Sequence, residues 1–233
     1  MTLATICSNA IKELAGFELP TTFFGNANLT ARSCVALVSR EMKTMEREHR
    51  WVELITTHTF STVNGTDAYS MPENFRAFAN MSQWDRTNHR YLSGPTSPAD
   101  WQWLKGDLAS GATIQRFFRV QGAYIYIHPV PTVSGDTIAF DYYSKATVTK
   151  QADSSNVVEW TSDNDTSRLD EDLLTMGLKW RFLQSKGMPF ETEYREYESI
   201  KEAAIDDNGG KPIINLGRNR IRVSNLPETG FGE

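Results

Sequence analysis

The spacing of apolar residues changes twice along this 233-residue chain, and that change constrains the fold most. Near both ends, apolar residues recur every three or four positions, which is the period of a helix with one buried face. In the middle they alternate with polar residues, which is the period of a strand. The pattern therefore predicts helices at both ends of the chain, around a β region of about residues 51–160.

Two helices are predicted before the β region. The first carries apolar residues from Leu3 to Leu14 and is closed by Gly16 and Pro20. The second is capped by Asn28 or Thr30 and runs to about Arg47. Cys7 and Cys34 each fall on an apolar stripe, so we expect buried free thiols and no disulfide framework.

Two more helices are predicted after the β region. Ser167 and Asp170 have the spacing of a capping box, so a helix is expected to begin at Ser167 and to end near Ser185. Apolar residues cover much of its circumference, which places it at the centre of the core. A last helix opens at Pro189 and ends before Gly209, and residues 189–208 hold seven acidic and two basic side chains.

Turn signals divide the β region. Asn64-Gly65 predicts a hairpin, and Thr87-Asn88 predicts a second pair of short strands. Ser97 or Pro98 is expected to start a short helix. Turns at Gln121-Gly122 and at residues 134–136 then predict a three-stranded antiparallel meander over about residues 118–142.

The predicted fold class is α+β, with helices segregated from an antiparallel sheet. We expect an antiparallel helix bundle made by the two N-terminal and two C-terminal helices, with an inserted β domain and an extended C-terminal tail. The corresponding domains are residues 1–50 with 161–208, residues 51–160, and residues 209–233.

Composition and motifs argue against several functions. The formal net charge of −5 disfavours sequence-independent DNA binding, which needs a basic surface. The four histidines lack metal-ligand spacing, and no GxSxG, GxxxxGK[ST] or HExxH motif occurs. We therefore expect no catalytic residue, no metal and no cofactor.

Two alternatives concern binding. Aromatic residues of the β region could form a carbohydrate platform, as in a tail-associated receptor-binding module; they are Trp101, Trp103, Tyr124, Tyr126, Tyr142 and Tyr143. Arginines near the C-terminus could contact phosphate. Their alternation with Asn219, Ile221 and Val223 is better suited to a strand that docks on a protein sheet edge.

The pentapeptide LPETG, residues 226–230, is the signal that sortases cleave. A sortase substrate also needs a signal peptide and an apolar span after the pentapeptide. The first residues, MTLATICSNAIKELAG, have no basic region and no continuous apolar core, and only three residues follow LPETG. We expect no wall anchor and no membrane span, and we interpret the motif as the tip of an extended tail.

Four stretches resemble a known family. They are EREHRWVELITTHTF (residues 46–60), DAYSMPENFRAFANMSQWDR (67–86), YIYIHPVPTVSGDTIAFDYYSK (124–145) and IRVSNLPETGFG (221–232). With the order of predicted elements, they resemble the head-to-tail adaptor proteins of tailed bacteriophages, also called tail tubular or gatekeeper-type adaptors.

The resemblance implies a structural virion protein at the head-tail junction, assembled in the host cytoplasm. It implies a ring, usually of twelve copies, that joins the portal protein to a tail or nozzle protein. Genomic DNA would pass through the ring without specific binding.

The resemblance also implies a C-terminal docking arm. The residues expected to dock on the portal or a neighbour are Ile213, Ile214, Leu216, Arg218, Arg220, Ile221, Arg222, Val223, Leu226 and Phe231. The acidic side chains of the last helix suit a channel face, because like charge limits contact with phosphate. The predicted channel residues are Glu191, Glu193, Glu196, Glu198 and Glu202.

Overall fold

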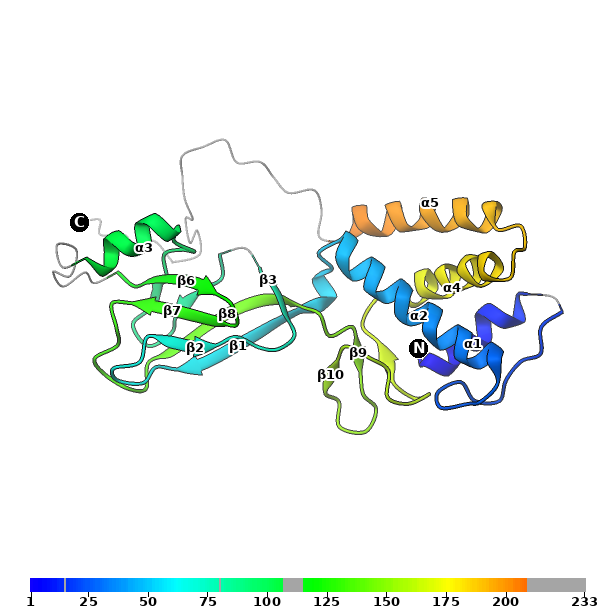
Figure 1. Cartoon of the computed structure of the whole chain (residues 1–233), viewed down its shortest axis with the longest axis horizontal. Coiled ribbons are helices and arrows are strands. Elements are labelled where there is room, and N and C mark those ends of the chain that lie inside the picture. The colour runs from blue at the N-terminus through cyan, green and yellow to red at the C-terminus, as the bar shows by residue number, and fades with distance from the viewer. Residues whose placement is uncertain (15, 80, 107–114, 209–233) are drawn as a thin grey trace, which may run out of the picture.

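The computed structural model describes residues 1–14, 16–79, 81–106 and 115–208. In this part of the chain, most helices gather at one end of an elongated molecule and most strands at the other (Figure 1). The helices are α1 (Leu3–Lys12), α2 (Leu29–Glu48), α3 (Pro98–Lys105), α4 (Glu171–Ser185) and α5 (Glu191–Asp207), with a 3-10 turn, η1 (Val52–Leu54). The predicted α+β class is confirmed.

Among the described residues, the strands form three antiparallel sheets. Their bounds are β1 (Ile55–Ser61), β2 (Ala68–Ser70), β3 (Phe75–Phe78), β4 (Trp84–Asp85), β5 (Arg90–Tyr91), β6 (Phe117–Gln121), β7 (Tyr124–His128), β8 (Thr137–Ser144), β9 (Val148–Thr149), β10 (Asn156–Val157) and β11 (Thr166–Ser167). The largest sheet has the order β1-β8-β4-β5, with β3 also paired to β8. The other two have the orders β10-β9-β11 and β2-β7-β6.

Side-chain caps fix where the helices begin. Asn28 caps α2 by accepting a hydrogen bond from the Thr30 amide at 2.8 Å, as one of the two predicted caps. Asp170 caps α4 by accepting from the Leu173 amide at 2.9 Å. The prediction that α4 begins at Ser167 is therefore wrong, because Ser167 pairs with Val148 in the small β9–β11 sheet.

Two pairing predictions are also wrong. Asn64-Gly65 does form a turn with a positive φ at Gly65, but the flanking strands do not pair with each other. Instead β1 pairs with β8, and β2 pairs with β7. The meander is limited to the β6–β7 hairpin, because β8 leaves that sheet for the larger one. The β4–β5 pair and the helix after Ser97 are confirmed.

Two hydrophobic clusters correspond to the two ends of the molecule. At the helical end, α4 contacts α1, α2 and α5, so the helix with apolar residues around much of its circumference is central, as its sequence predicts. Val148 and Trp160, from the region of the small sheet, also join this cluster. The second cluster lies between the other sheets and includes Phe118, Ile125 and Phe140.

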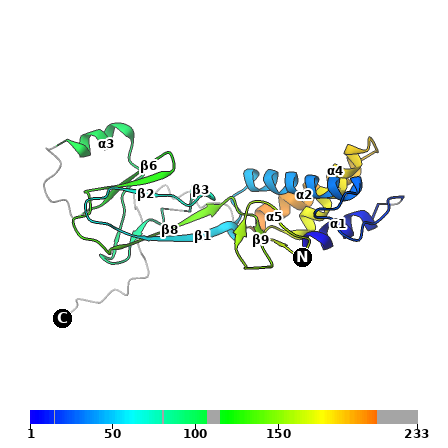
Figure 2. The same cartoon turned by 60° about the horizontal axis from the view of Figure 1, so that its bottom comes forward.

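Residues near the end of α2 join the two parts (Figures 1 and 2). The Trp51 indole donates to the Met45 carbonyl at 2.8 Å. Arg76, from β3, donates to the Arg47 carbonyl at 2.8 Å and the His49 carbonyl at 3.1 Å, and pairs with Glu46. A guanidinium on these final carbonyls satisfies acceptors that the helix leaves open.

Both cysteines are buried and free, as predicted. Burial raises the pKa of the Cys34 thiol to about 11, and burial also raises the pKa of Cys7 strongly. The thiolate is the reactive form, so both side chains act as small apolar groups.

Candidate functional site

The acidic helix α5 presents most of its carboxylates to solvent. Glu191, Glu196 and Glu202 are exposed, whereas Glu193 and Glu198 are half-buried. At 3.6 residues per turn, Glu191, Glu198 and Glu202 follow one stripe of the helix. Glu193 lies near the packed side that carries Tyr197. The five predicted channel residues are therefore not all on one face.

The basic side chain of Lys201 neutralises part of the negative charge of this stripe. Lys201 lies 2.7 Å from a Glu198 oxygen and 3.3 Å from a Glu48 oxygen. Burial opposes the charge of Lys201, but these two carboxylates outweigh it and raise its pKa. Glu191 and Glu202 are thus the carboxylates of the stripe that remain exposed to solvent.

A buried polar group attaches α5 to the core. The Glu41 carboxylate, fully buried on α2, accepts hydrogen bonds from the Tyr197 hydroxyl and from Nε of Arg181. The Arg181 guanidinium also lies 4.4 Å above the ring of Trp180. Burial, followed by the nearby Glu41 carboxylate, raises the pKa of Tyr197 far above its ordinary value. The hydroxyl is therefore a fixed donor.

The C-terminal end of α5 is fixed beside the start of β1. The Asn208 side chain accepts from the Val52 amide at 2.9 Å and donates to both Glu53 oxygens at 2.7 Å. The His49 ring lies 3.3 Å from the Asn208 carbonyl. These contacts determine where the rest of the chain starts. All ten residues predicted to dock, from Ile213 to Phe231, lie outside the described residues.

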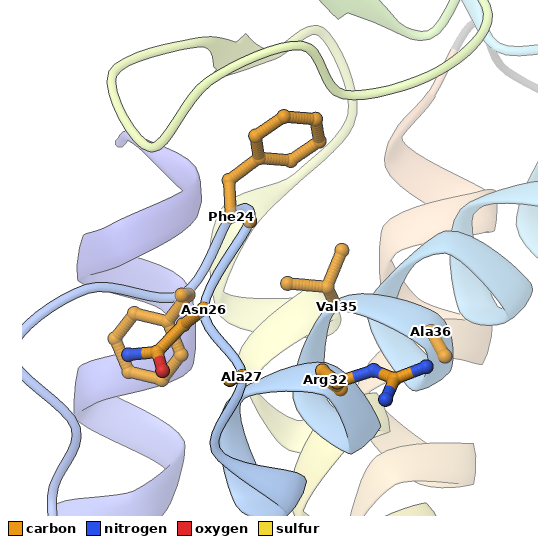
Figure 3. A pocket seen from close by; sticks show the side chains of 8 residues that line it. Phe24, Asn26, Ala27, Arg32, Val35 and Ala36 are labelled. Atoms are coloured by element: carbon orange, nitrogen blue, oxygen red, sulfur yellow. The ribbon is translucent and has the colours of Figure 1, made fainter.

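An apolar hollow lies between residues 23–27 and α2 (Figure 3). Phe24, Val35 and Ala36 border it, and Phe24 is 43% exposed. The Asp163 carboxylate holds the loop by accepting from the amides of Phe23, at 3.0 Å, and Phe24, at 2.7 Å. The sequence predicted only a loop here, because a contact between residues 140 positions apart leaves no local signal.

The predicted aromatic platform is only partly exposed. Trp103 and Tyr124 are 68% and 49% exposed. Trp101, Tyr142 and Tyr143 are buried, and Tyr126 is half-buried. Three of the six rings therefore pack inside the protein, and the six do not form one exposed stacking surface.

Within residues 1–14, 16–79, 81–106 and 115–208, no group of three or more His, Cys, Asp or Glu side chains could hold a metal ion. No helix in this described part is long and apolar enough to cross a membrane.

The acidic stripe of α5 and the apolar hollow beside α2 are both exposed on the described part of the chain. The comparisons with known proteins add the family. A family model described as SU10 adaptor protein matches residues 1–213. The chain belongs to the SU10 adaptor protein family, so the resemblance to phage head-to-tail adaptors is confirmed. Among curated proteins, no match to the sequence was found.

Proposed function

We propose that this chain forms a ring at the head-tail junction of a tailed phage, joining the portal vertex to the tail and continuing the DNA channel. The family match over residues 1–213 is the observation that carries the proposal. The proposed partners are the portal protein, a tail or nozzle protein, and further copies of this chain, twelve in the ring.

The acidic stripe of α5 supports a channel role. Glu191 and Glu202 are exposed, and like charge opposes tight contact with the phosphate backbone. In this proposal α5 faces the bore and DNA passes without specific binding. We further propose that the helices of residues 1–50 and 161–208 form the ring body as a bundle, and that residues 51–160 form the β domain, with Val148 and Trp160 packed on the helices.

Residues 209–233 are the proposed docking arm on the portal. Ile213, Ile214 and Ile221 supply apolar area, and burial is worth about 25 cal/mol per Å² before ordering costs. Because a ring presents many arms at once, weak single contacts add up to stable association.

The test is sedimentation of the purified chain with the portal protein of the same genome. We expect a complex with several copies of this chain per portal ring. The variant Ile213→Asp/Ile214→Asp/Ile221→Asp should lose the complex, while the matched variant Ile213→Val/Ile214→Val/Ile221→Val should keep it. Full association by the aspartate variant would contradict the docking arm, and no complex with the unaltered chain would contradict the adaptor role.

A further inference from the structure

Strand β1 forms one edge of the largest sheet. Its seven residues pair with β8 along their whole length, from Ile55 opposite Tyr143 to Ser61 opposite Thr137. Among the described residues, β8 is its only strand neighbour. The other edge of β8 is occupied by β3 and β4. As far as the described residues go, the outer edge of β1 is therefore open for its full length.

The hydrogen-bond register identifies which residues face outward. The Thr62 amide donates to the Asp136 carbonyl at 2.8 Å, so residues 56, 58, 60 and 62 face β8. The alternate residues Thr57, Thr59 and Ser61 then direct their N–H and C=O groups to the open edge. None of these backbone groups has a hydrogen-bond partner among the described residues.

Hydrogen bonds on the opposite side of β8 agree with this register. The Asp141 and Thr137 carbonyls accept from the amides of Ala79 and Arg86, at 2.9 Å and 2.8 Å. Odd-numbered residues of β8 therefore face β3 and β4, and even-numbered ones face β1.

Nothing in the strand protects this edge. Natural proteins protect an exposed edge with lysine, proline or a bulge. The sequence of β1, ITTHTFS, has no charged residue and no proline, and its register with β8 is continuous. Unpaired donors and acceptors over a run rich in threonine form a template for strand addition.

The two faces of β1 differ in polarity. Thr57, Thr59 and Ser61 are exposed on one face. On the other, Phe60 packs against the second hydrophobic cluster, and the His58 ring lies 5.2 Å from that of Phe140. A strand added here would need one polar face and one apolar face.

The sequence of this chain contains a segment with such an alternation of polar and apolar residues. Asn208 is bonded to Val52 and Glu53, next to the first residue of β1. Residues 209–218 can span about 33 Å, whereas a seven-residue strand covers about 23 Å. Residues 218–223 can therefore reach any point of the edge. In this segment Arg218, Arg220 and Arg222 alternate with Asn219, Ile221 and Val223.

We propose that residues 218–223 add to the open edge of β1 within the same molecule. Ile221 and Val223 extend the apolar face beside Phe60, and the arginines share the polar face with Thr57. There the Thr57 hydroxyl donates to the Asp141 carboxylate at 2.6 Å, which supplies a complementary charge. The tether sets the local concentration of the segment in the millimolar range, which favours pairing within one molecule over pairing between two.

This pairing goes beyond the proposed function, because it concerns the docking arm before the chain binds a portal. In that state residues 218–223 are paired with β1. Under the proposed function, residues 218–223 would leave the edge of β1 when they bind the portal protein. That exchange rests on the adaptor role, whereas the pairing itself is a property of the chain alone.

The test is amide hydrogen exchange of the full chain by NMR, without a partner. We expect the amides of Thr57, Thr59 and Ser61 to exchange at least ~100-fold more slowly than unprotected amides, equally at two protein concentrations ten-fold apart. The variant Ile221→Pro should restore fast exchange at these three positions, because proline removes a donor and stops strand pairing. The control Ile221→Val should keep the protection.

The amides of Thr56, His58 and Phe60, which bond to β8, report in every sample whether the sheet is intact. Fast exchange of the three outward amides in the unaltered chain would overturn the proposal, and so would protection that survives Ile221→Pro. Protection that grows with concentration would show that a second copy occupies the edge, which also overturns it. None of these outcomes depends on portal binding, so the adaptor role is judged separately.

Discussion

The Glu41 carboxylate is fully buried between helices, yet both its oxygens are used. Arg181 compensates its charge and Tyr197 fills the second oxygen, so α2, α4 and α5 meet at one side chain. Gly177 makes this approach possible, because a Cβ there would lie 2.6 Å from Cγ of Glu41. Sequence patterns did not reveal this group, because Glu41 lies 140 or more residues away from Arg181 and Tyr197.

Removing only Arg181 should lower the free energy of unfolding more than removing both Glu41 and Arg181. Arg181→Met leaves a buried charge without compensation, so we expect the free energy of unfolding to fall by about 3–5 kcal/mol. Glu41→Leu/Arg181→Met removes both charges and should recover much of that loss. Urea denaturation measures both. An Arg181→Met variant as stable as the unaltered protein would mean that Glu41 is not buried as described.

Asp165 organises the small β9–β11 sheet. Burial opposes its ionisation, but hydrogen bonds from Thr161, Gln151 and Ser162 outweigh burial and hold its pKa at about 2. The Thr161 amide is the closest donor, at 2.7 Å. The ordinary value is 3.8, so the folded protein favours the charged form.

The free energy of unfolding should therefore depend on pH, because Asp165 takes up a proton in acid. A lowered folded-state pKa contributes stability that is present above about pH 4 and is lost as pH falls toward 2. A shift of this size corresponds to about 2 kcal/mol. Asp165→Asn should lower stability at pH 7 and flatten the profile between pH 4 and 2. Melting temperatures measured between pH 4 and 2 check this prediction. If the melting temperature falls equally steeply with pH in both proteins, the lowered pKa of Asp165 is refuted.

At the scale of elements, local signals predicted helices better than strand partners. The apolar stripes and Asn28 place α1 and α2 almost as observed, because caps and periodicity act within a few residues. The start of α4 was misplaced because Ser167 and Asp170 both suit a cap, and strand pairing of Ser167 with Val148 decided between them. Partners of β1 and β8 are set by contacts about 80 residues apart, which no turn signal encodes.

The edge register makes a prediction about β1 itself. Thr59 directs its N–H away from β8, so Thr59→Pro should leave the β1–β8 pairing intact and should lower the unfolding free energy less than a proline at a residue that bonds to β8. His58 faces β8, so His58→Pro removes a ladder hydrogen bond and leaves its carbonyl partner on β8 unpaired, which should cost about 1–3 kcal/mol. Chemical denaturation of the two neighbouring variants provides a matched comparison. Equal losses would show that the assigned register is wrong.

At the scale of the whole molecule, the helical end and the β end are joined near the end of α2, where Arg76, Trp51 and Asn208 meet backbone groups. The α+β class followed from the change of period along the chain. The elongated arrangement (Figure 2) did not follow from this change of period. Nor did the position of Asn208 beside Val52, because both features depend on long-range contacts. The predicted docking residues stay a prediction, since they lie outside the described residues.

The central claim is that this chain is the ring between portal and tail, and electron cryomicroscopy of the chain mixed with the portal protein of its genome tests it most directly. We expect a symmetric ring stacked on the portal, with α5 facing the bore and the chain beyond Asn208 entering the portal subunits. A chain that stays monomeric beside unoccupied portal rings would contradict the account.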